Sequence, residues 1–300
     1  MSNFVEGPVR VRVPATCANL GPGFDALGLA VGLHDELSAR VTPGGLAIDV
    51  EGEGAESVTR DESHLVVRAM RRTFGVLGDP PDGVALECRN RIPHGRGLGS
   101  SAAAIVAGIL LARALIVDGA ERLPDGQVLA LASELEGHPD NVAPCLLGGL
   151  TIAWMHGTAR AVRRDIDPAV VPVVLVPPFA ASTDIARGLL PEAVPHRDAA
   201  QNAGRAALLV AALTGTPQAL FDATEDRLHQ GYRAPAMPET AKLVDALRAD
   251  ALPAVVSGAG PTVLVLARGE TEAEAAIART PDGWTGLRLP VDPVGAQLVG

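Results

Sequence analysis

The sequence has few aromatic residues: Phe, Trp and Tyr make up only 3% of its 300 residues, whereas 47% of the residues are hydrophobic. Val, Leu, Ile and Ala must therefore fill the interior. These residues favour β-branched strands and Ala/Leu-rich helices, so we expect a mixed α/β protein. The length is sufficient for two domains of ordinary size or for one large domain.

Cysteine and positive charge are also scarce. The three cysteines, Cys17, Cys88 and Cys145, are odd in number and widely spaced, so the sequence predicts neither a disulfide framework nor a zinc site. Reduced thiols of this kind are typical of a cytosolic protein. The formal net charge of −10 argues against a nucleic-acid partner, because such a partner requires a basic surface that displaces counterions.

Long hydrophobic runs are missing as well. The most apolar stretch, residues 102–117, is short for a membrane span and contains Arg113, so it predicts a buried core helix. Residues 1–8 lack the basic start and apolar run of a signal peptide. We therefore expect a cytoplasmic protein with no membrane partner.

Alternating and periodic segments predict the order of the elements. Residues 9–13 alternate as a half-buried strand, which Pro14 should end. Ser63 is a candidate N-cap for a helix that stops at Gly78. A looser stretch near residue 160 indicates a boundary between domains at 1–160 and 161–300. Further strands are expected at 84–89, 146–153, 170–176, 262–267, 285–289 and 296–299, and further helices at 102–117, 127–136, 184–190, 199–213, 241–249 and 272–278.

The strongest local signal is the glycine-rich segment 97–101, which leads directly into the Ala-rich helix. Glycines let the backbone approach a ligand closely, and the first turn of a helix offers free N–H groups and partial positive charge. Together these features suit a phosphate. Ser100 and Ser101 add hydroxyls for phosphate oxygens or Mg²⁺. The segment has no lysine, so it is not a Walker A loop, and a simple helix-capping turn is the alternative.

Three segments, 14–25, 93–103 and 257–262, are similar in order and spacing to the signatures of the GHMP kinases, which move the γ-phosphate of ATP to a small alcohol. The resemblance implies an α+β fold with an N-terminal α/β domain like domain 2 of ribosomal protein S5 and a ferredoxin-like C-terminal domain. It also implies that ATP and Mg²⁺ bind between the two domains. The implied ATP-binding residues are Pro93, His94, Gly95, Arg96, Gly97, Leu98, Gly99, Ser100, Ser101 and Ala102.

Within this family, segments 136–144, 182–187 and 229–233 most resemble the branch that phosphorylates L-homoserine in threonine biosynthesis. The resemblance also implies a homodimer. A mevalonate- or sugar-type kinase and a non-catalytic, ligand-binding family member are the alternatives. A nucleotide-binding oxidoreductase is disfavoured, because no acidic residue follows the glycine loop at the required distance.

Homoserine carries an ammonium, a carboxylate and a hydroxyl, and the resemblance assigns residues to the first two. Asp25 is expected to bind the ammonium with Asn19 beside it, although both residues also suit turn hydrogen bonds. Arg187 and Arg233 are expected to clamp the carboxylate through paired, charge-assisted bonds. Without the resemblance, either arginine would be interpreted as a surface residue. Gly260 is expected to let the backbone pass close to the substrate.

The remaining assignments concern the reacting hydroxyl. Phosphoryl transfer needs little early proton removal, so we expect Asn141 to orient the hydroxyl and Asp140 to shape the site or accept the proton late. The alternative is a polar turn ahead of Pro144. His138 is expected to hydrogen-bond behind the site, with direct substrate contact as the alternative. Thr183 is expected either to contact the transferring phosphate or to cap the helix that carries Arg187.

The resemblance places the Mg²⁺-binding glutamate at Glu134, together with Ser100 or Ser101. Glu134 and Glu136 lie two positions apart on the predicted helix, so they face different directions and only one can point at the phosphates. Glu136 stays open as the alternative. The third possibility is that both are exposed helix glutamates.

Overall fold

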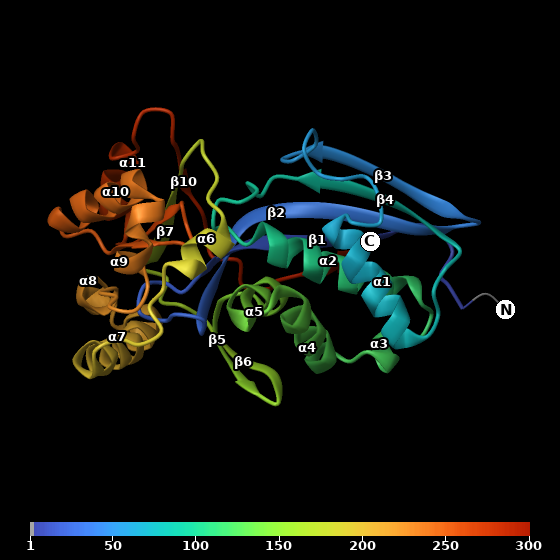
Figure 1. The fold of residues 1–300 in the computed structure, drawn as a ribbon, viewed down its shortest axis with the longest axis horizontal. Coiled ribbons are helices and arrows are strands. Elements are labelled where there is room, and N and C mark those ends of the chain that lie inside the picture. The colour runs from blue at the N-terminus through green and yellow to red at the C-terminus, as the bar shows by residue number, and fades with distance from the viewer. Residues whose placement is uncertain (1–2) are drawn as a thin grey trace.

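The computed structural model describes residues 3–300, except for the side chains at positions 183 and 184. It contains two β-sheets, and Figure 1 shows the larger sheet and its helices beside the smaller one. The larger sheet has the order β11-β1-β2-β4-β3, with β5 paired to β2 and β6 paired to β5, and only β3 and β4 are parallel. Its strands are β1 (Val9–Ala18), β2 (Leu27–Thr42), β3 (Gly45–Gly52), β4 (Gly83–Asn90), β5 (Leu150–His156), β6 (Thr158–Arg164) and β11 (Gln297–Val299).

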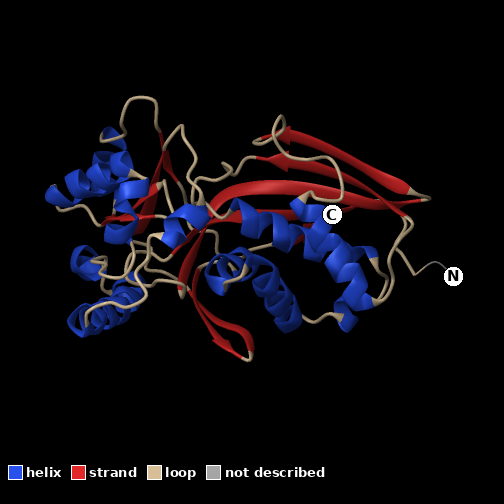
Figure 2. Ribbon diagram, viewed as in Figure 1, coloured by secondary structure: helices blue, strands red, loops and turns tan. Residues whose placement is uncertain are grey.

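A layer of helices covers one face of the larger sheet (Figure 2). Its central member, α2, is apolar on nearly every side, so it is buried between β1 and its neighbouring helices. This burial fixes the N-terminus of α2, and with it the glycine-rich segment, against the sheet. The helices of this layer are α1 (Leu65–Leu77), α2 (Ser100–Leu115), α3 (Gly119–Arg122), α4 (Asp125–Glu136) and α5 (Pro139–Leu147).

The smaller sheet is antiparallel and has the order β10-β7-β9-β8. It packs against α10 and α11 around a second hydrophobic core. Its strands are β7 (Val170–Val176), β8 (Ala254–Val256), β9 (Val263–Arg268) and β10 (Thr285–Arg288). The helices of this half are α6 (Thr183–Gly188), α7 (His196–Gly215), α8 (Leu220–Ala223), α9 (Gln230–Arg233), α10 (Pro238–Ala249) and α11 (Glu270–Ala278), with short 3₁₀ turns η1 (Pro217–Ala219) and η2 (Ala234–Ala236).

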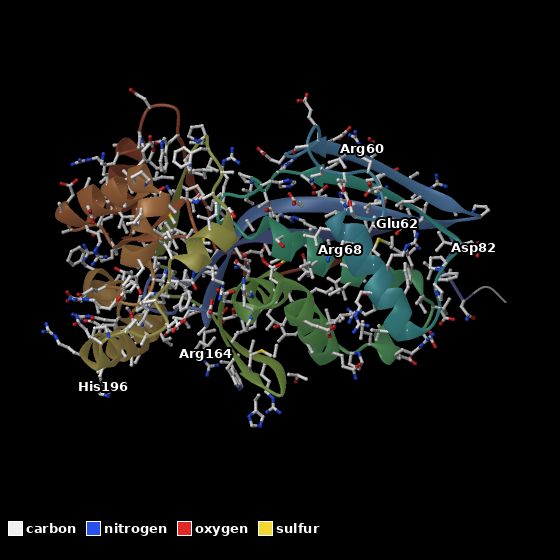
Figure 3. All side chains as sticks on the ribbon, viewed as in Figure 1. Arg60, Glu62, Arg68, Asp82, Arg164 and His196 are labelled. Carbon is white, nitrogen blue, oxygen red and sulfur yellow. The ribbon has the colours of Figure 1, made fainter. Side chains whose placement is uncertain are left out.

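Charged side chains project outward from both halves, as Arg60, Asp82, Arg164 and His196 do in Figure 3. Within residues 3–300, no helix combines the length and the hydropathy that crossing a membrane requires.

Three local predictions were wrong. The N-cap of α1 is His64 rather than Ser63, and its side chain makes no capping hydrogen bond. Pro14 does not end the first strand, because a register shift between Pro14 and Ala15 accommodates the proline and the strand continues to Ala18. Asp140 and Asn141 do not lie in an open turn but in the first turn of α5, which begins with Pro139. The helix extends to Leu147, so β5 begins only at Leu150, later than expected.

Candidate active site

A polar cavity of about 160 Å³ lies where three glycine-containing loops meet. They are the N-terminal loop (residues 19–25), the phosphate loop (residues 93–101) and the C-terminal glycine loop (residues 257–261). Most predicted site residues lie around this cavity, although they are far apart in the sequence. The side chains that line it are those of Asn19, Asp25, Ser100, Ser101, Glu136, His138, Asp140, Asn141, Arg187 and Arg233.

The phosphate loop depends on glycine at positions with positive φ. Gly97 has a φ of 77°, and a Cβ there would lie 2.3 Å from the carbonyl oxygen of Ser257. This close packing allows the Ser257 hydroxyl to donate a hydrogen bond to the Gly97 carbonyl at 2.6 Å. The amide of Thr262 also donates to the Arg96 carbonyl, at 3.2 Å. The phosphate loop and the C-terminal glycine loop therefore hold each other in shape.

Thr16 connects the phosphate loop to Asn141. Its backbone amide donates to the Leu98 carbonyl at 3.0 Å, and its buried hydroxyl donates to Oδ1 of Asn141 at 2.8 Å. A Cβ at Gly99 would lie only 1.9 Å from Oγ1 of Thr16, so only glycine permits this contact. The geometry places the predicted hydroxyl-orienting residue next to the predicted phosphate site. Thr16 lies in the signature segment 14–25, although the sequence analysis assigned no role to its side chain.

Three of the predicted ATP-binding residues turn their side chains away from the cavity. Leu98 and Ala102 are fully buried in the core. The Arg96 guanidinium donates to the carbonyls of Pro177, Pro178 and His94, so it braces the loop. At these positions only the backbone is available to a ligand.

A second pocket, of about 290 Å³, lies on the other side of Ser100 and Ser101, which line both spaces. Its walls are largely apolar, and its polar lining residues include His64 and His94. Burial raises the pKa of Cys88 in its wall to about 12, so this thiol stays protonated. Sequence reasoning did not find this pocket, because its walls come from four separate segments.

The predicted substrate-binding charges lie together at one end of the polar cavity. Arg187 and Asp25 form a half-exposed ion pair at 3.0 Å. The guanidinium carbons of Arg233 and Arg187 lie 5.2 Å and 6.0 Å from the ring centre of Phe24. Asn19 donates to the Gly258 carbonyl and accepts from the amide of Asp25, so it holds this end of the cavity in place.

Arg233 is a buried cation with no carboxylate partner. Its exposed fraction is 2%, and no carboxylate among the described side chains lies within 4.0 Å of it. Its Nε also has no hydrogen-bond partner in the described part of the chain. Burial, together with the nearby Arg187, lowers the pKa of its guanidinium. Because a buried unpaired charge is costly, such an arginine is suited to an anionic ligand.

His138 and Asp140 form a tight pair that also lines the cavity. Nδ1 of His138 lies 2.5 Å from Oδ1 of Asp140, which is almost fully buried. This hydrogen bond raises the pKa of His138 although burial opposes the shift. The pair is adjacent to Glu136, whose own pKa is raised by burial.

Glu134, the Mg²⁺ ligand that the resemblance implies, does not line the cavity. Glu134 is exposed and pairs with Arg72 of α1 at 3.0 Å, outside the cavity. Glu136 instead lines the cavity, and its Oε2 accepts a hydrogen bond from the Ser101 hydroxyl at 2.7 Å. Helix geometry explains the difference, since residues two positions apart point in different directions. The described residues contain no cluster of three or more acidic, His or Cys side chains that could hold a metal.

Two further predictions concern Thr183 and Gly260. The side chain of Thr183 lies outside the described part, although the cap of α6 is Ser182, whose hydroxyl accepts from the amide of Ile185. Gly260 does not line the cavity; Gly258 and Ala259 do. A Cβ at Gly260 would lie 2.5 Å from Sδ of Met237, so this glycine serves the packing of the loop.

The structure combines a glycine-rich phosphate loop, the buried helix α2 that follows it, and two mostly antiparallel sheets. This combination is typical of a class of small-molecule kinases. The chain matches the models of the GHMP kinase N-terminal domain over residues 63–149 and of the GHMP kinase C-terminal domain over residues 205–284. The chain belongs to the GHMP kinase family.

Its relatives within this family include homoserine kinases. The homoserine kinase of Streptomyces avermitilis is 59% identical over 99% of this chain and 97% of that relative. The crystal structure of homoserine kinase from Cytophaga hutchinsonii covers the whole chain and 99% of its own, with a TM-score of 0.83 at 24% identity. A putative homoserine kinase from Listeria monocytogenes is 30% identical over 97% of this chain and 99% of its own, with a TM-score of 0.76.

Proposed function

We propose that the protein transfers the γ-phosphate of ATP to the hydroxyl of L-homoserine and forms O-phospho-L-homoserine and ADP, a step of threonine biosynthesis. The observation that carries the proposal is Arg233, a buried guanidinium that has no counterion among the described side chains and lines the same cavity as the phosphate loop. The full-length similarity to homoserine kinases supports the choice of acceptor.

The two spaces that share Ser100 and Ser101 suit the two parts of ATP. The apolar pocket is the proposed site of the adenine, since flat apolar walls with a few polar groups are typical of such sites. The phosphate loop and the first turn of α2 are the proposed site of the triphosphate, through backbone amides and the helix dipole. The γ-phosphate would then lie at the polar cavity.

Homoserine is proposed to bind with its ammonium at Asp25 and its carboxylate at Arg187 and Arg233. To bind homoserine in this way, Asp25 and Arg187 must break their ion pair. Asp25 then pairs with the ammonium of the substrate and Arg187 with its carboxylate. A half-exposed pair of this kind contributes only about 0–1 kcal/mol, so the exchange is inexpensive. A mevalonate-type substrate offers no ammonium to Asp25.

In the proposed reaction the homoserine hydroxyl oxygen forms a bond to the γ-phosphorus, and the bond from this phosphorus to the bridging oxygen of ADP breaks. Asn141 is proposed to orient the hydroxyl, and Asp140 to accept its proton late in the transfer. Catalysis then depends chiefly on positioning and electrostatic stabilisation. Thr183 remains a proposed contact of the transferring phosphate, and His138 a proposed hydrogen-bonding group that holds Asp140.

Glu136, together with Ser100 or Ser101, is the proposed Mg²⁺ site. The Ser101–Glu136 hydrogen bond supports this fit, because it brings one carboxylate and a hydroxyl together at the phosphate loop. One carboxylate is sufficient, since Mg²⁺ commonly completes its shell with phosphate oxygens and water. When bound, Mg²⁺ would neutralise charge on the phosphates.

We further propose, as the family resemblance implies, a cytoplasmic homodimer whose chain divides near residue 160.

A substrate panel tests the proposed function. With ATP and Mg²⁺, the purified protein should release ADP fastest with L-homoserine, compared with mevalonate, galactose and L-serine. Equal or faster turnover of mevalonate would overturn the choice of acceptor, and no turnover of any alcohol would favour a ligand-binding role.

A further inference from the structure

His229 is fully buried between the N-terminal loop and α9, and both of its ring nitrogens have partners. Nε2 lies 2.8 Å from the Gly21 carbonyl oxygen, which can only accept, so Nε2 carries the proton. The lone pair of Nδ1 then faces Nη1 of Arg233 at 3.4 Å. The imidazole is therefore a bridge from the backbone of the N-terminal loop to the unpaired arginine.

A ring contact strengthens this bridge. The imidazole stacks on Phe24 with ring centres 5.0 Å apart and an interplanar angle of 22°. The guanidinium of Arg233 also lies over the Phe24 ring, at 5.2 Å, and that of Arg187 lies at 6.0 Å. Because Phe24 directly precedes Asp25 in the chain, His229 contacts both the arginine and the loop that carries the aspartate.

Burial, rather than the surrounding charges, favours the neutral form of the His229 ring. Burial lowers the pKa of His229, and Arg233 acts in the same direction, whereas Asp226 and Asp25 oppose the shift. The carboxylate of Asp226 already accepts hydrogen bonds from the amides of Leu228, His229 and Gln230, so it does not depend on a charged imidazole. A neutral ring can accept a hydrogen bond from Arg233, whereas an imidazolium would repel it.

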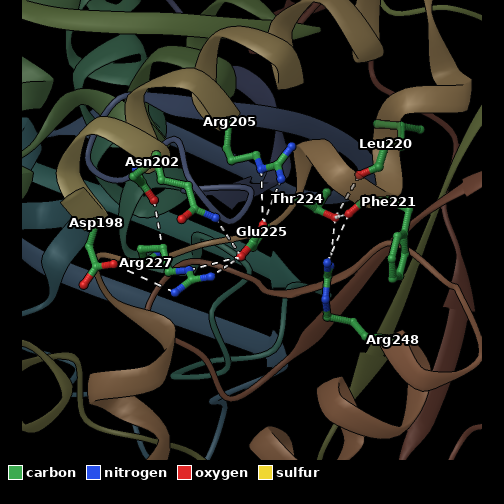
Figure 4. Close-up of polar contacts among 10 residues, drawn as sticks. Asp198, Asn202, Arg205, Leu220, Phe221, Thr224, Glu225, Arg227 and Arg248 are labelled. Atoms are coloured by element: carbon green, nitrogen blue, oxygen red, sulfur yellow. Dashed lines mark hydrogen bonds and ion pairs between the residues drawn. The ribbon is translucent and has the colours of Figure 1, made fainter.

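Polar contacts hold the segment that precedes His229, residues 220–227, in place, as Figure 4 shows. Glu225 accepts from Arg205 and Arg227, and Arg248 donates to the Phe221 carbonyl and to the Thr224 hydroxyl. Asn202 accepts from the amide of Arg227 and donates to the Pro22 carbonyl at 2.8 Å. This network fixes the start of α9 relative to the N-terminal loop, so His229 is a rigid support.

We propose that His229 is a positioning residue that sets the separation between Arg233 and Asp25, and thereby selects α-amino acid alcohols as acceptors. This role rests on the proposed function, in which Arg233 binds the substrate carboxylate and Asp25 the ammonium. The imidazole touches neither substrate group. It holds the unpaired guanidinium against Phe24, at a fixed distance from the aspartate on the same loop.

Three variants separate the two hydrogen bonds. In His229→Asn, the amide oxygen takes the place of Nδ1 and can still accept from Arg233. In His229→Gln, the amide nitrogen takes the place of Nε2 and can still donate to Gly21. His229→Ala removes both. We expect Ala to raise the KM for homoserine at least about tenfold, with the KM for ATP unchanged and kcat within about threefold. Asn should restore most of the homoserine affinity and Gln much less.

Truncated ligands distinguish positioning of the carboxylate site from a general structural role. Two truncated analogues of homoserine serve as inhibitors: 4-hydroxybutanoate, which keeps the carboxylate, and 3-aminopropan-1-ol, which lacks it. Their inhibition constants are measured with homoserine as the varied substrate. His229→Ala should weaken 4-hydroxybutanoate about tenfold and leave 3-aminopropan-1-ol within about twofold. Equal weakening of both ligands, or equal rescue by Asn and Gln, would overturn the proposal.

A thermal unfolding transition shows whether each variant is folded. If His229→Ala does not fold, the comparison of His229→Asn with His229→Gln tests the positioning role. The outcomes also separate this proposal from the proposed function. If the wild type phosphorylates homoserine and His229→Ala keeps its KM, only the positioning role fails. If the wild type neither binds nor phosphorylates homoserine, the proposed function itself fails.

Discussion

The hydroxyl of Ser101, in the first turn of α2, donates a hydrogen bond to Oε2 of Glu136 at the end of α4, over 2.7 Å. This bond joins the phosphate loop to a carboxylate that the cavity partly buries. Two residues earlier, Glu134 points outward to Arg72. Separate substitutions of these two glutamates therefore test the proposed metal site.

Glu136→Gln should lower kcat at least about a hundredfold, because the variant loses the negative charge proposed to hold Mg²⁺. Steady-state turnover across a Mg²⁺ titration measures this loss. Glu134→Gln is the matched control and should stay within about twofold of the wild type, since its exposed ion pair contributes little. A large loss in Glu134→Gln with an active Glu136→Gln would contradict the assignment.

Arg233→Met should raise the KM for homoserine at least about thirtyfold, because the substrate carboxylate loses a charge-assisted partner. The same change should stabilise the fold by about 1–2 kcal/mol, since it removes a buried charge that has no carboxylate partner among the described residues. Steady-state kinetics and chemical denaturation measure the two effects. A variant that loses both stability and affinity would indicate that Arg233 supports the fold.

Gly97→Ala should destabilise the protein by about 2–4 kcal/mol and abolish ATP binding, because the new Cβ would meet the Ser257 carbonyl at a positive φ. Gly126→Ala, in α4, is the control. A Cβ there meets nothing within 4 Å, so this change should be neutral or stabilise by up to about 1 kcal/mol. Denaturation midpoints and nucleotide titrations measure both. An active, stable Gly97→Ala would show that the loop tolerates a side chain.

The His138–Asp140 pair predicts a pH-dependent stability. The hydrogen bond to Asp140 raises the pKa of His138 above the ordinary value of about 6.5. The stabilisation is therefore fully present below the unfolded-state pKa and is lost as the pH rises through the folded-state pKa. The free energy of unfolding of the wild type, relative to His138→Asn, should be greater at pH 6 than at pH 9. A difference that does not change with pH would indicate that His138 is neutral in the fold.

The sequence by itself determined the glycine-rich turn before α2 and several local elements, such as α2 and β7, but not β2 or β3. Glycines at 95, 97 and 99 before an Ala-rich helix predict a tight turn there, because backbone conformation and helix ends are largely local properties. The same holds for the αL stop of α1 at Gly78. The order of three motifs then carried the resemblance to the GHMP kinases, which the family models and the relatives confirm.

Only the tertiary structure decided which side chains share the cavity. The choice of Glu136 over Glu134 depends on how α4 is rotated against α2, and packing sets that rotation. The contact of Thr16 with Asn141 and the bridge of His229 from Gly21 to Arg233 join residues separated by 125 and 208 positions. A local sequence pattern cannot predict these contacts. They form because distant segments pack against one another, and that packing is a property of the whole fold.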